Sequence, residues 1–314
     1  MDYRLSVFLA VAEHGSLTKA ARALHLSQPA VTKHVRLLEE AMGRPLFDRS
    51  AQGVRPTRAG ALLLDHARQV ARLDREVLDR IRGNKGAPSG KLALGATSTV
   101  GQYLLPAWLV EARRAWPELR LSVRDGNTEE IVEAALEGKI DLGLIEGRCC
   151  RAGLAAEEFL EDEIVCVASP RHPAAQGRPL AAAALGRQTW IFREKGSGTR
   201  DAVETALRRE GIETRRWAID LELGSSEAIK AVVAAGHGLS FLSRVAVARE
   251  VARDALRVVP VRGLSVVRQF SFIYPRGPRP EPRSGAGAFL GLVLRSTGRL
   301  PRAKGEAITS SYDI

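Results

Sequence analysis

Three polar side chains at four-residue steps, Gln28, Thr32 and Arg36, have the chemistry of a surface that reads nucleic-acid bases. An amide can pair with an adenine edge, a threonine can contact the thymine methyl group, and a guanidinium can reach guanine or a phosphate. Residues four apart lie on one face of a helix, so these side chains would share an outward face. The pattern predicts a helix that enters the major groove of double-stranded DNA.

A second group of residues, the segment REKGSGTR from Arg193 to Arg200, has the chemistry of an anion site. Its glycines permit close approach of the backbone, and its serine and threonine supply hydroxyl donors. A helix that follows would present free N–H groups at its positive end. The alternative is an ordinary glycine turn capped by Thr199. We interpret the segment as an anion site.

The elements that would position the DNA-reading face are two short helices, a longer helix and a hairpin. Ser16 and Ser27 can cap the second and third helices, and Pro29 is tolerated in the first turn of the third. The inward face of that helix would carry Val31, Val35 and Leu38. A two-stranded wing is expected on either side of residues 50–53, where Arg49 and Arg55 could hold backbone phosphates.

Residues 8–60 resemble the winged helix-turn-helix of the LysR-type transcriptional regulators. The resemblance lies in the run LTKAARALHLSQPAVTKHVRLLEE, in LFDR at the wing and in PTRAG at the junction that follows. The family more often has Ser at position 32 and Arg at position 33, and Thr32 and Lys33 keep a hydroxyl and a cation there. The bland alternative is a three-helix protein-interaction module. The candidate DNA contacts are Thr18, Ser27, Gln28, Pro29, Ala30, Thr32, Lys33, Arg36, Arg49 and Arg55.

A long helix is predicted from Arg58 to about Ile81, because the segment lacks proline and repeats apolar residues at coiled-coil spacing. Thr57 can cap its start, and Gly83, Gly86 and Pro88 would end it. The apolar positions are Leu63, Ala67, Val70, Leu73, Val77 and Ile81. The helix either packs on its own domain or pairs with a second copy, and we favour a dimerisation helix, which would impose two-fold symmetry on the operator.

Beyond Pro88 the chain alternates strands and helices, which predicts an α/β domain. The expected elements include a helix through Leu104 to Trp116 and a strand from Ile164 to Ala168. This half resembles the effector-binding domain of the same family, with two Rossmann-like lobes similar to type 2 periplasmic-binding proteins. We therefore divide the chain into a winged helix-turn-helix (1–58), a dimerisation linker helix and hinge (59–87), an effector-binding domain (88–300) and a flexible tail (301–314). Lobe I is expected at about 88–164 and 269–298, and lobe II at about 165–268.

Ligands of open α/β sheets bind at the carboxyl ends of the strands, and three segments are expected there: 96–99, 146–148 and 193–200. Each hydroxyl in these segments could instead serve as a helix cap. The REKGSGTR segment is similar to one in the branch of the family that regulates carbon fixation and sulfur metabolism, which implies a phosphorylated metabolite or a sulfur oxyanion as the signal. The candidate effector residues are Thr97, Ser98, Thr99, Gln102, Glu146, Arg193, Gly196, Ser197, Gly198 and Thr199.

Composition supports polyanionic partners, because the 314 residues carry a formal net charge of +11. The amino-terminal apolar run is short and interrupted by Arg4, Glu13 and His14, unlike a secretory signal, and no stretch reaches the length of a membrane span. Three cysteines, two of them Cys149 and Cys150, offer no even disulfide framework. These observations predict a cytoplasmic protein.

Enzymatic function is not expected, because the sequence contains no P-loop, no HExxH zinc site and no GxSxG elbow. Metal-ligand spacing is also absent among the cysteines and histidines, so we expect no metal and no cofactor other than a small anionic effector. The resemblance implies a homodimer or homotetramer and contact with RNA polymerase. The alternatives are a solute-binding protein or an enzyme fused to a DNA-binding module.

Overall fold

The computed structural model describes residues 2–50, 53–82, 87–214 and 217–298, and the tail predicted at 301–314 lies outside them. The chain divides into two units, Met1–Gly86 and Ala87–Ile314, and each is described by itself.

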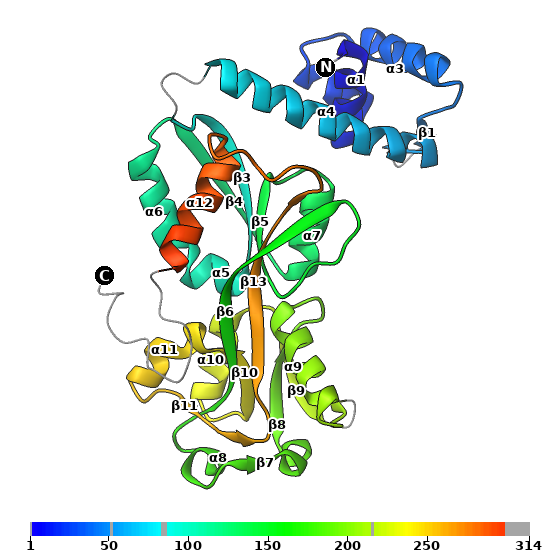
Figure 1. Cartoon of the computed structure of the whole chain (residues 1–314). Helices are drawn as coiled ribbons and strands as arrows, with labels where there is room; N and C mark the ends of the chain where they lie inside the picture. Colours follow the sequence, from blue (N-terminus) through cyan, green and yellow to red (C-terminus); the bar gives the residue numbers. More distant parts are fainter. Residues whose placement is uncertain (1, 51–52, 83–86, 215–216, 299–314) are drawn as a thin grey trace. The chain divides into compact units, whose positions relative to one another are not determined.

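The first unit is helical with a two-stranded wing (Figure 1). Ser16 accepts a hydrogen bond from the N–H of Lys19, and Ser27 accepts one from Ala30, so both predicted caps are confirmed. Thr57 likewise caps the last helix through the N–H of Gly60, at 3.0 Å. The elements are α1 Tyr3–His14, α2 Leu17–Ala23, α3 Gln28–Met42, β1 Phe47–Ser50, β2 Gly53–Pro56 and α4 Arg58–Arg82.

The second unit is built on a nine-stranded mixed sheet in the order β4-β3-β5-β13-β6-β10-β8-β9, with β11 paired to β6. A separate two-stranded sheet pairs β12 with β7. The strands are β3 Gly90–Thr97, β4 Leu119–Gly126, β5 Leu142–Glu146, β6 Leu154–Ala168, β7 Leu180–Ala181, β8 Thr189–Arg193, β9 Ala218–Leu223, β10 Leu239–Ser243, β11 Arg257–Val258, β12 Val261–Arg262 and β13 Val266–Pro275.

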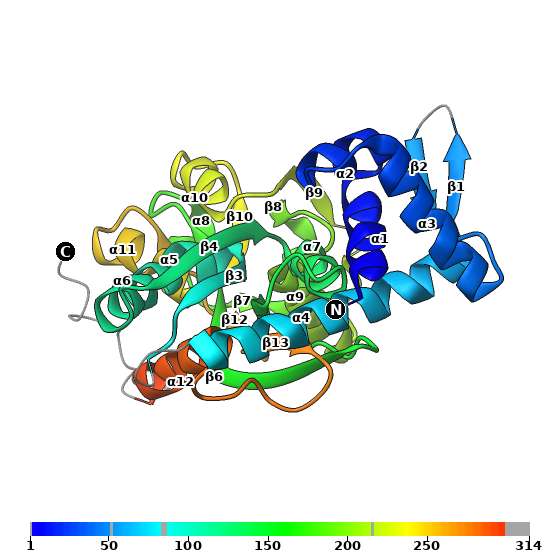
Figure 2. The ribbon, with the colours of Figure 1, turned by 90° about the horizontal axis from the view of Figure 1, so that it is seen from above.

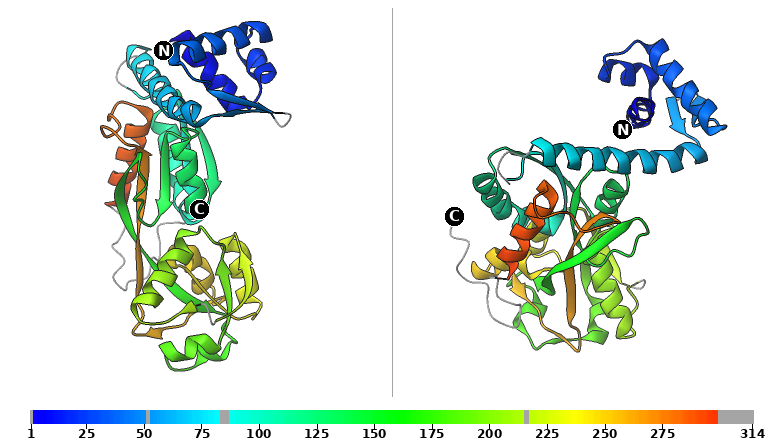
Figure 3. Two further views of the ribbon diagram at one scale, coloured as in Figure 1. Left: turned by 90° about the vertical axis from the view of Figure 1, so that its right-hand side faces the viewer. Right: turned by 45° about the horizontal axis from the view of Figure 1, so that its top comes forward.

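Helices cover both faces of the sheet in each lobe, as Figures 2 and 3 show from other sides. In lobe I, α6 and α12 bury one apolar core with Trp108 and Phe289, and α7 buries another with Ile131. In lobe II, α9 packs on the core around Trp190, and α10 and α11 pack on a separate core. The helices are α5 Ser98–Tyr103, α6 Leu105–Ala115, α7 Thr128–Leu136, α8 Pro173–Gln176, α9 Gly198–Arg209, α10 Ser226–Ala234, α11 Arg244–Ala252 and α12 Gly285–Thr297, with a 3-10 helix η2 at Ala182–Arg187.

The two lobes are joined by the antiparallel pair β6 and β13, which run side by side from one lobe to the other (Figure 1). Their pairing is continuous from Val266 opposite Ile164 to Pro275 opposite Leu154, apart from a register shift between Phe270 and Ser271. The sequence predicted a strand only over residues 164–168 in place of the 15-residue β6. We call this pair the interlobe ribbon.

Candidate DNA interface and effector site

The outward face of α3 carries the predicted base-reading side chains. Gln28 and Arg36 are exposed, whereas Val31, Val35 and Leu38 on the opposite face are buried. The hydroxyl of Thr18 donates to Oε1 of Gln28 at 3.1 Å, so α2 orients the first of these groups. The side chain of Arg36 is 78% exposed and paired with Glu40, a neighbour that the sequence analysis did not include.

The wing follows α3 as expected, with β1 and β2 in antiparallel register from Phe47 opposite Pro56 to Ser50 opposite Gly53. The carboxylate of Glu39 accepts the backbone N–H groups of Leu46 and Phe47, which ties the start of the wing to the recognition helix. Arg55 is exposed on β2, where it can reach a phosphate. The side chain of Arg49 lies outside the described part of the structure.

The helix α4 divides into two halves. Leu63, Ala67 and Val70 pack on the core of the first unit, in line with the alternative of a helix that packs on its own domain. Leu73 and Val77 are 51% and 50% exposed, so the second half of the helix presents an apolar surface within the described part of the first unit. The side chain of Ile81 is outside the described residues.

The carboxylate of Glu146, at the end of β5, is the group at which segments of both lobes are joined by hydrogen bonds. It accepts the backbone N–H of Thr99 at 2.9 Å and the hydroxyl of Thr199 at 2.8 Å, and it pairs with Arg268. These partners come from α5 in lobe I, α9 in lobe II and the interlobe ribbon. Burial alone would raise the pKa of Glu146, but the charges of Arg268 and Arg193 and the hydrogen bonds from Thr99 lower it to about 2.

Gly198 allows this junction to form. A side chain at position 198 would lie 2.4 Å from the carbonyl oxygen of Glu146, so only glycine lets the start of α9 lie against the end of β5. Gly196, with a φ of +85°, makes the turn that precedes α9. The two glycines of the GSG run therefore bring protein segments together at this point.

Arg268 and its second partner, Asp162, were missed by the sequence analysis. Nε of Arg268 donates to Asp162 at 2.8 Å, and Ser243 donates to the other oxygen at 2.7 Å. Burial raises the pKa of Asp162 although Arg268 opposes that effect. Arg268 and Asp162 lie opposite each other on the two strands of the interlobe ribbon. They are 106 residues apart in the sequence, so only the register of the two strands reveals the pair.

Arg193 is the second buried cation of this site, with a side chain only 2% exposed. Its guanidinium donates to Ser98 in lobe I at 3.1 Å and to Ser226 at the start of α10 at 3.3 Å. It also donates from two nitrogens to the carboxylate of Glu194, at 2.8 and 2.9 Å. The predicted residues Ser98 and Arg193 are therefore in contact across the lobes.

Two of the predicted hydroxyls are buried and lack a hydrogen-bond partner among the described residues. These are the hydroxyls of Thr97 and Ser197, whose residues are 1% and 2% exposed. Each residue immediately precedes a helix, yet neither side chain makes the capping hydrogen bond that its position allows. Gln102, in contrast, is exposed on α5.

A further polar contact joins the lobes at the other end of α5. The hydroxyl of Tyr103 donates to Glu227 on α10, and Nζ of Lys230 lies 5.1 Å from the centre of the tyrosine ring. Lys230 is itself held by Glu250 at 2.8 Å. Burial and the Glu227 carboxylate raise the pKa of Tyr103, which keeps the phenol a hydrogen-bond donor.

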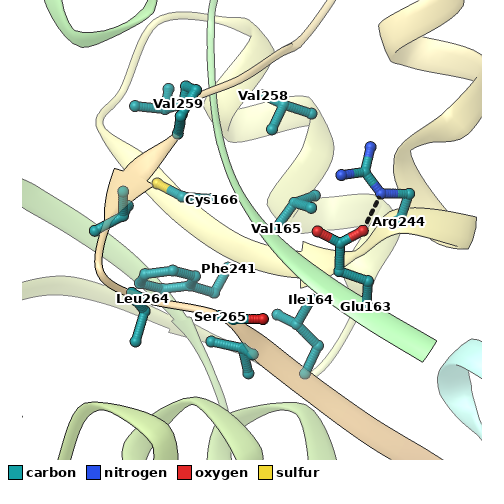
Figure 4. Close-up of a pocket in the computed structure, with 13 residues that line it drawn as sticks. Glu163, Ile164, Val165, Cys166, Phe241, Arg244, Val258, Val259, Leu264 and Ser265 are labelled. Atoms are coloured by element: carbon teal, nitrogen blue, oxygen red, sulfur yellow. Dashed lines mark hydrogen bonds and ion pairs between the residues drawn. The ribbon is translucent and has the colours of Figure 1, made fainter. Parts of the chain in front are cut away.

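Lobe II also contains a hollow of about 280 Å³ outside this cluster (Figure 4). Most of the residues that line it are of apolar type, Phe241 and Val259 among them, and the ion pair between Arg244 and Glu163 lies at one side. Burial raises the pKa of Cys166, so this thiol in the wall stays protonated. None of the predicted effector residues lines the hollow.

Among the described residues, no group of three or more histidine, cysteine or acidic side chains is placed to hold a metal ion. In the same part of the chain, no helix combines the length and apolar character that a membrane crossing requires.

Two family models match the chain. One describes a bacterial regulatory helix-turn-helix protein of the lysR family and covers residues 3–61. The other describes a LysR substrate binding domain and covers residues 85–296. The chain belongs to the LysR family of transcriptional regulators. It is a DNA-binding regulator with an effector-binding domain, and members of this family bind DNA and small effectors and form oligomers.

Similar proteins support this assignment over nearly the whole length. CysL, a transcriptional regulator of Bacillus subtilis, is 34% identical over 86% of this LysR-family chain and 89% of that protein. The RuBisCO operon transcriptional regulator of Allochromatium vinosum is 35% identical over 95% of this chain and 96% of that protein. The regulatory domain of CcmR from Synechocystis, solved in complex with 2-PG, is 29% identical with a TM-score of 0.61, over 68% of this chain and all of that one.

Proposed function

We propose that this regulator is controlled by a small anionic metabolite bound between lobes I and II, beside Arg193 and the segments 97–99 and 197–199. The observation that carries the proposal is the meeting of these segments at Glu146, where two buried hydroxyls, those of Thr97 and Ser197, have no hydrogen-bond partner among the described residues. A buried hydroxyl without a hydrogen bond is costly, and an oxyanion is the partner that satisfies it.

The class of anion is suggested by charge and by similarity. Arg193 and the start of α9 supply positive charge on one side of the segments. The CcmR regulatory domain was solved with 2-PG, a small phosphorylated acid. We therefore propose a phosphorylated carboxylate or a sulfur oxyanion as the effector of this chain.

The DNA-binding half is proposed to act as a dimer. The exposed apolar half of α4, with Leu73 and Val77, would pair with a second copy, and two α3 helices would then read half-sites related by two-fold symmetry. Closure of the lobes on the anion would favour one arrangement of these readers, because the ligand binds the two states with different affinity. We further propose a tetramer, contact with RNA polymerase, action in the cytoplasm and no catalytic activity.

Thermal unfolding of the full chain with 2-PG, sulfite or sulfate tests the effector site. A ligand that binds the folded state raises the melting temperature, and an anion at 100 times its Kd contributes about 2.7 kcal/mol. Without ligand, Thr97→Ala and Ser197→Ala should unfold at or above the melting temperature of the wild type, because each removes a buried hydroxyl that no described residue satisfies.

Both variants should bind the anion at least about tenfold more weakly than the wild type, as expected for the loss of a hydrogen bond to a charged group. Ser122→Ala, on the exposed strand β4, removes a hydroxyl elsewhere in lobe I and should leave the stabilisation unchanged. Absence of stabilisation by every anion, or stabilisation that survives both variants, would contradict the proposed site.

A further inference from the structure

The buried cations at the lobe boundary already have carboxylate partners. Arg268 is paired with Glu146 and Asp162, and Arg193 is paired with Glu194. An anionic effector that enters this boundary must therefore compete with a carboxylate of the protein itself. Which carboxylate gives way depends on how firmly each is held and on what it costs to return it to water.

Glu194 is the carboxylate that can leave at the lowest cost. Its side chain is 24% exposed, compared with 2% for Glu146 and none for Asp162. Glu146 is also held by Thr99 and Thr199, and Asp162 is also held by Ser243. Within the described residues, the Glu194 carboxylate accepts hydrogen bonds from Arg193 alone.

The contact between Arg193 and Glu194 has the geometry that a bound oxyanion would use. Nε and Nη2 of the guanidinium donate in parallel to the two carboxylate oxygens, at 2.8 and 2.9 Å. This two-point fork is the arrangement in which arginine binds carboxylates and phosphates most strongly. Nη1 of the guanidinium also donates to Ser226, and Nη2 also donates to Ser98, so these serines would keep the guanidinium in place when Glu194 leaves.

We propose that Glu194 is an internal counter-ion of Arg193 that the effector displaces, and that this exchange lowers the affinity of every anion equally, a threshold that multiply charged oxyanions exceed and monocarboxylates do not. The inference rests on the proposed function. Replacement of one carboxylate by another leaves the charge opposite Arg193 unchanged. A phosphate monoester carries a charge of about −1.5 to −2 at neutral pH, so it adds attraction where water is largely excluded. Glu194 therefore keeps ordinary monocarboxylates out of the site.

Isothermal titration of the full chain with 2-PG and with glycolate, the same acid without its phosphate, tests the exchange. Glu194→Gln removes the competitor and should tighten binding of both ligands by about tenfold, which corresponds to about 1.4 kcal/mol. Glycolate binding should become measurable in that variant. Glu210→Gln, at the exposed far end of α9, removes the same charge without freeing Arg193 and should leave both affinities unchanged.

Equal gains for the two ligands distinguish competition from repulsion. If Glu194 acted only through its charge, the more highly charged 2-PG would gain more than glycolate. Glu194→Asp keeps the charge but shortens the side chain by one methylene, so it should also release the fork and tighten binding. Tryptophan fluorescence shows whether each variant is folded. If Glu194→Gln is not folded, the affinities of Glu194→Asp serve as the test.

Several outcomes overturn the exchange. If the wild type binds 2-PG and Glu194→Gln binds it no more tightly, displacement is refuted. The same holds if Glu194→Gln gains affinity for 2-PG but not for glycolate. Both results leave the anion site in place. A Glu194→Asp variant that binds both ligands like the wild type also refutes it. Failure of 2-PG, sulfite and sulfate to bind both the wild type and Glu194→Gln overturns the proposed effector class, and the exchange with it.

Discussion

Replacement of Glu146 by glutamine removes the negative charge at the point where both lobes and the interlobe ribbon meet. The change keeps the shape of the side chain but removes its ion pair with Arg268, whose side chain is as buried as that of Glu146. A pKa lowered from its ordinary value of 4.5 to about 2 corresponds to about 3 kcal/mol of unfolding free energy at neutral pH, since each pKa unit is worth about 1.4 kcal/mol. This is a large part of the roughly 5–15 kcal/mol of a typical domain.

The pH dependence of this contribution has a definite sign. Because the pKa of Glu146 is lower in the folded state, its stabilisation is complete above the unfolded pKa of 4.5 and is lost as the pH falls toward about 2. At about pH 3 the remaining contribution should be near 1 kcal/mol. The difference between wild type and Glu146→Gln should therefore shrink steadily as the solution is acidified through this range.

Urea unfolding followed by tryptophan fluorescence measures this difference in the full chain. The four tryptophans, Trp108, Trp116, Trp190 and Trp217, all lie in the second unit, so the signal reports the effector domain alone. With a urea dependence of about 3 kcal/mol per molar, the midpoint should fall by about 1 M at neutral pH.

An exposed ion pair on the same ribbon provides the matched control. Glu158 is paired with Arg148, and their side chains are 45% and 77% exposed. Glu158→Gln should therefore cost less than about 1 kcal/mol at any pH. The reasoning would be refuted if Glu146→Gln lowered the free energy of unfolding by less than about 1 kcal/mol at neutral pH. It would also be refuted if the difference in unfolding free energy between wild type and variant did not shrink on acidification.

Three further outcomes follow from the two units. Gln28→Ala should weaken operator binding by about 1–3 kcal/mol in fluorescence anisotropy and leave nonspecific DNA binding unchanged. Arg55→Ala should weaken binding to both DNAs and reduce the slope of log affinity against log salt concentration by about one. Equal loss of affinity on both DNAs for Gln28→Ala would contradict base reading. Val77→Glu should dissociate the proposed dimer in sedimentation experiments, whereas Gln69→Glu on the same helix should not, and a dimer that survives Val77→Glu would place the contact elsewhere. Tyr103→Phe removes a hydrogen bond between α5 and α10 and should weaken effector binding by about threefold to tenfold in calorimetry. An unchanged affinity for the effector would contradict this role of Tyr103.

Local sequence was sufficient to predict the helix starts of the first unit. A serine or threonine cap acts on an N–H group three residues away, so Ser16, Ser27 and Thr57 could be assigned without knowledge of the fold. The order of strands and helices was also predictable, because it follows from alternating apolar runs. It placed the segments 96–99, 146–148 and 193–200 at the carboxyl ends of strands, and hydrogen bonds at Glu146 join residues of all three.

Features that depend on pairing of distant segments were not predictable. Arg268 and Asp162 occur in strands whose register the sequence does not specify, and neither residue belongs to a recognisable motif. The first ten residues of β6, 154–163, include five acidic side chains, and only three of the ten are buried, so this part of the strand could not be distinguished from a loop. The predicted helix from Leu104 to Trp116 is instead preceded by α5 and begins at Leu105, and Pro106 in its first turn was a signal that could have located this start.

The interlobe ribbon determines how the two lobes can move. The chain passes from lobe I to lobe II in β6 and returns in β13, and these two crossings are hydrogen-bonded to each other. A hinge of this kind resists stretching and sliding but yields to torsion, because twisting a two-stranded ribbon costs little while its pairs stay intact. The pairing is irregular at the register shift between Phe270 and Ser271, and a β-bulge at such a place increases the local twist. Under the proposed function, effector binding would therefore rotate one lobe relative to the other about the long axis of the ribbon.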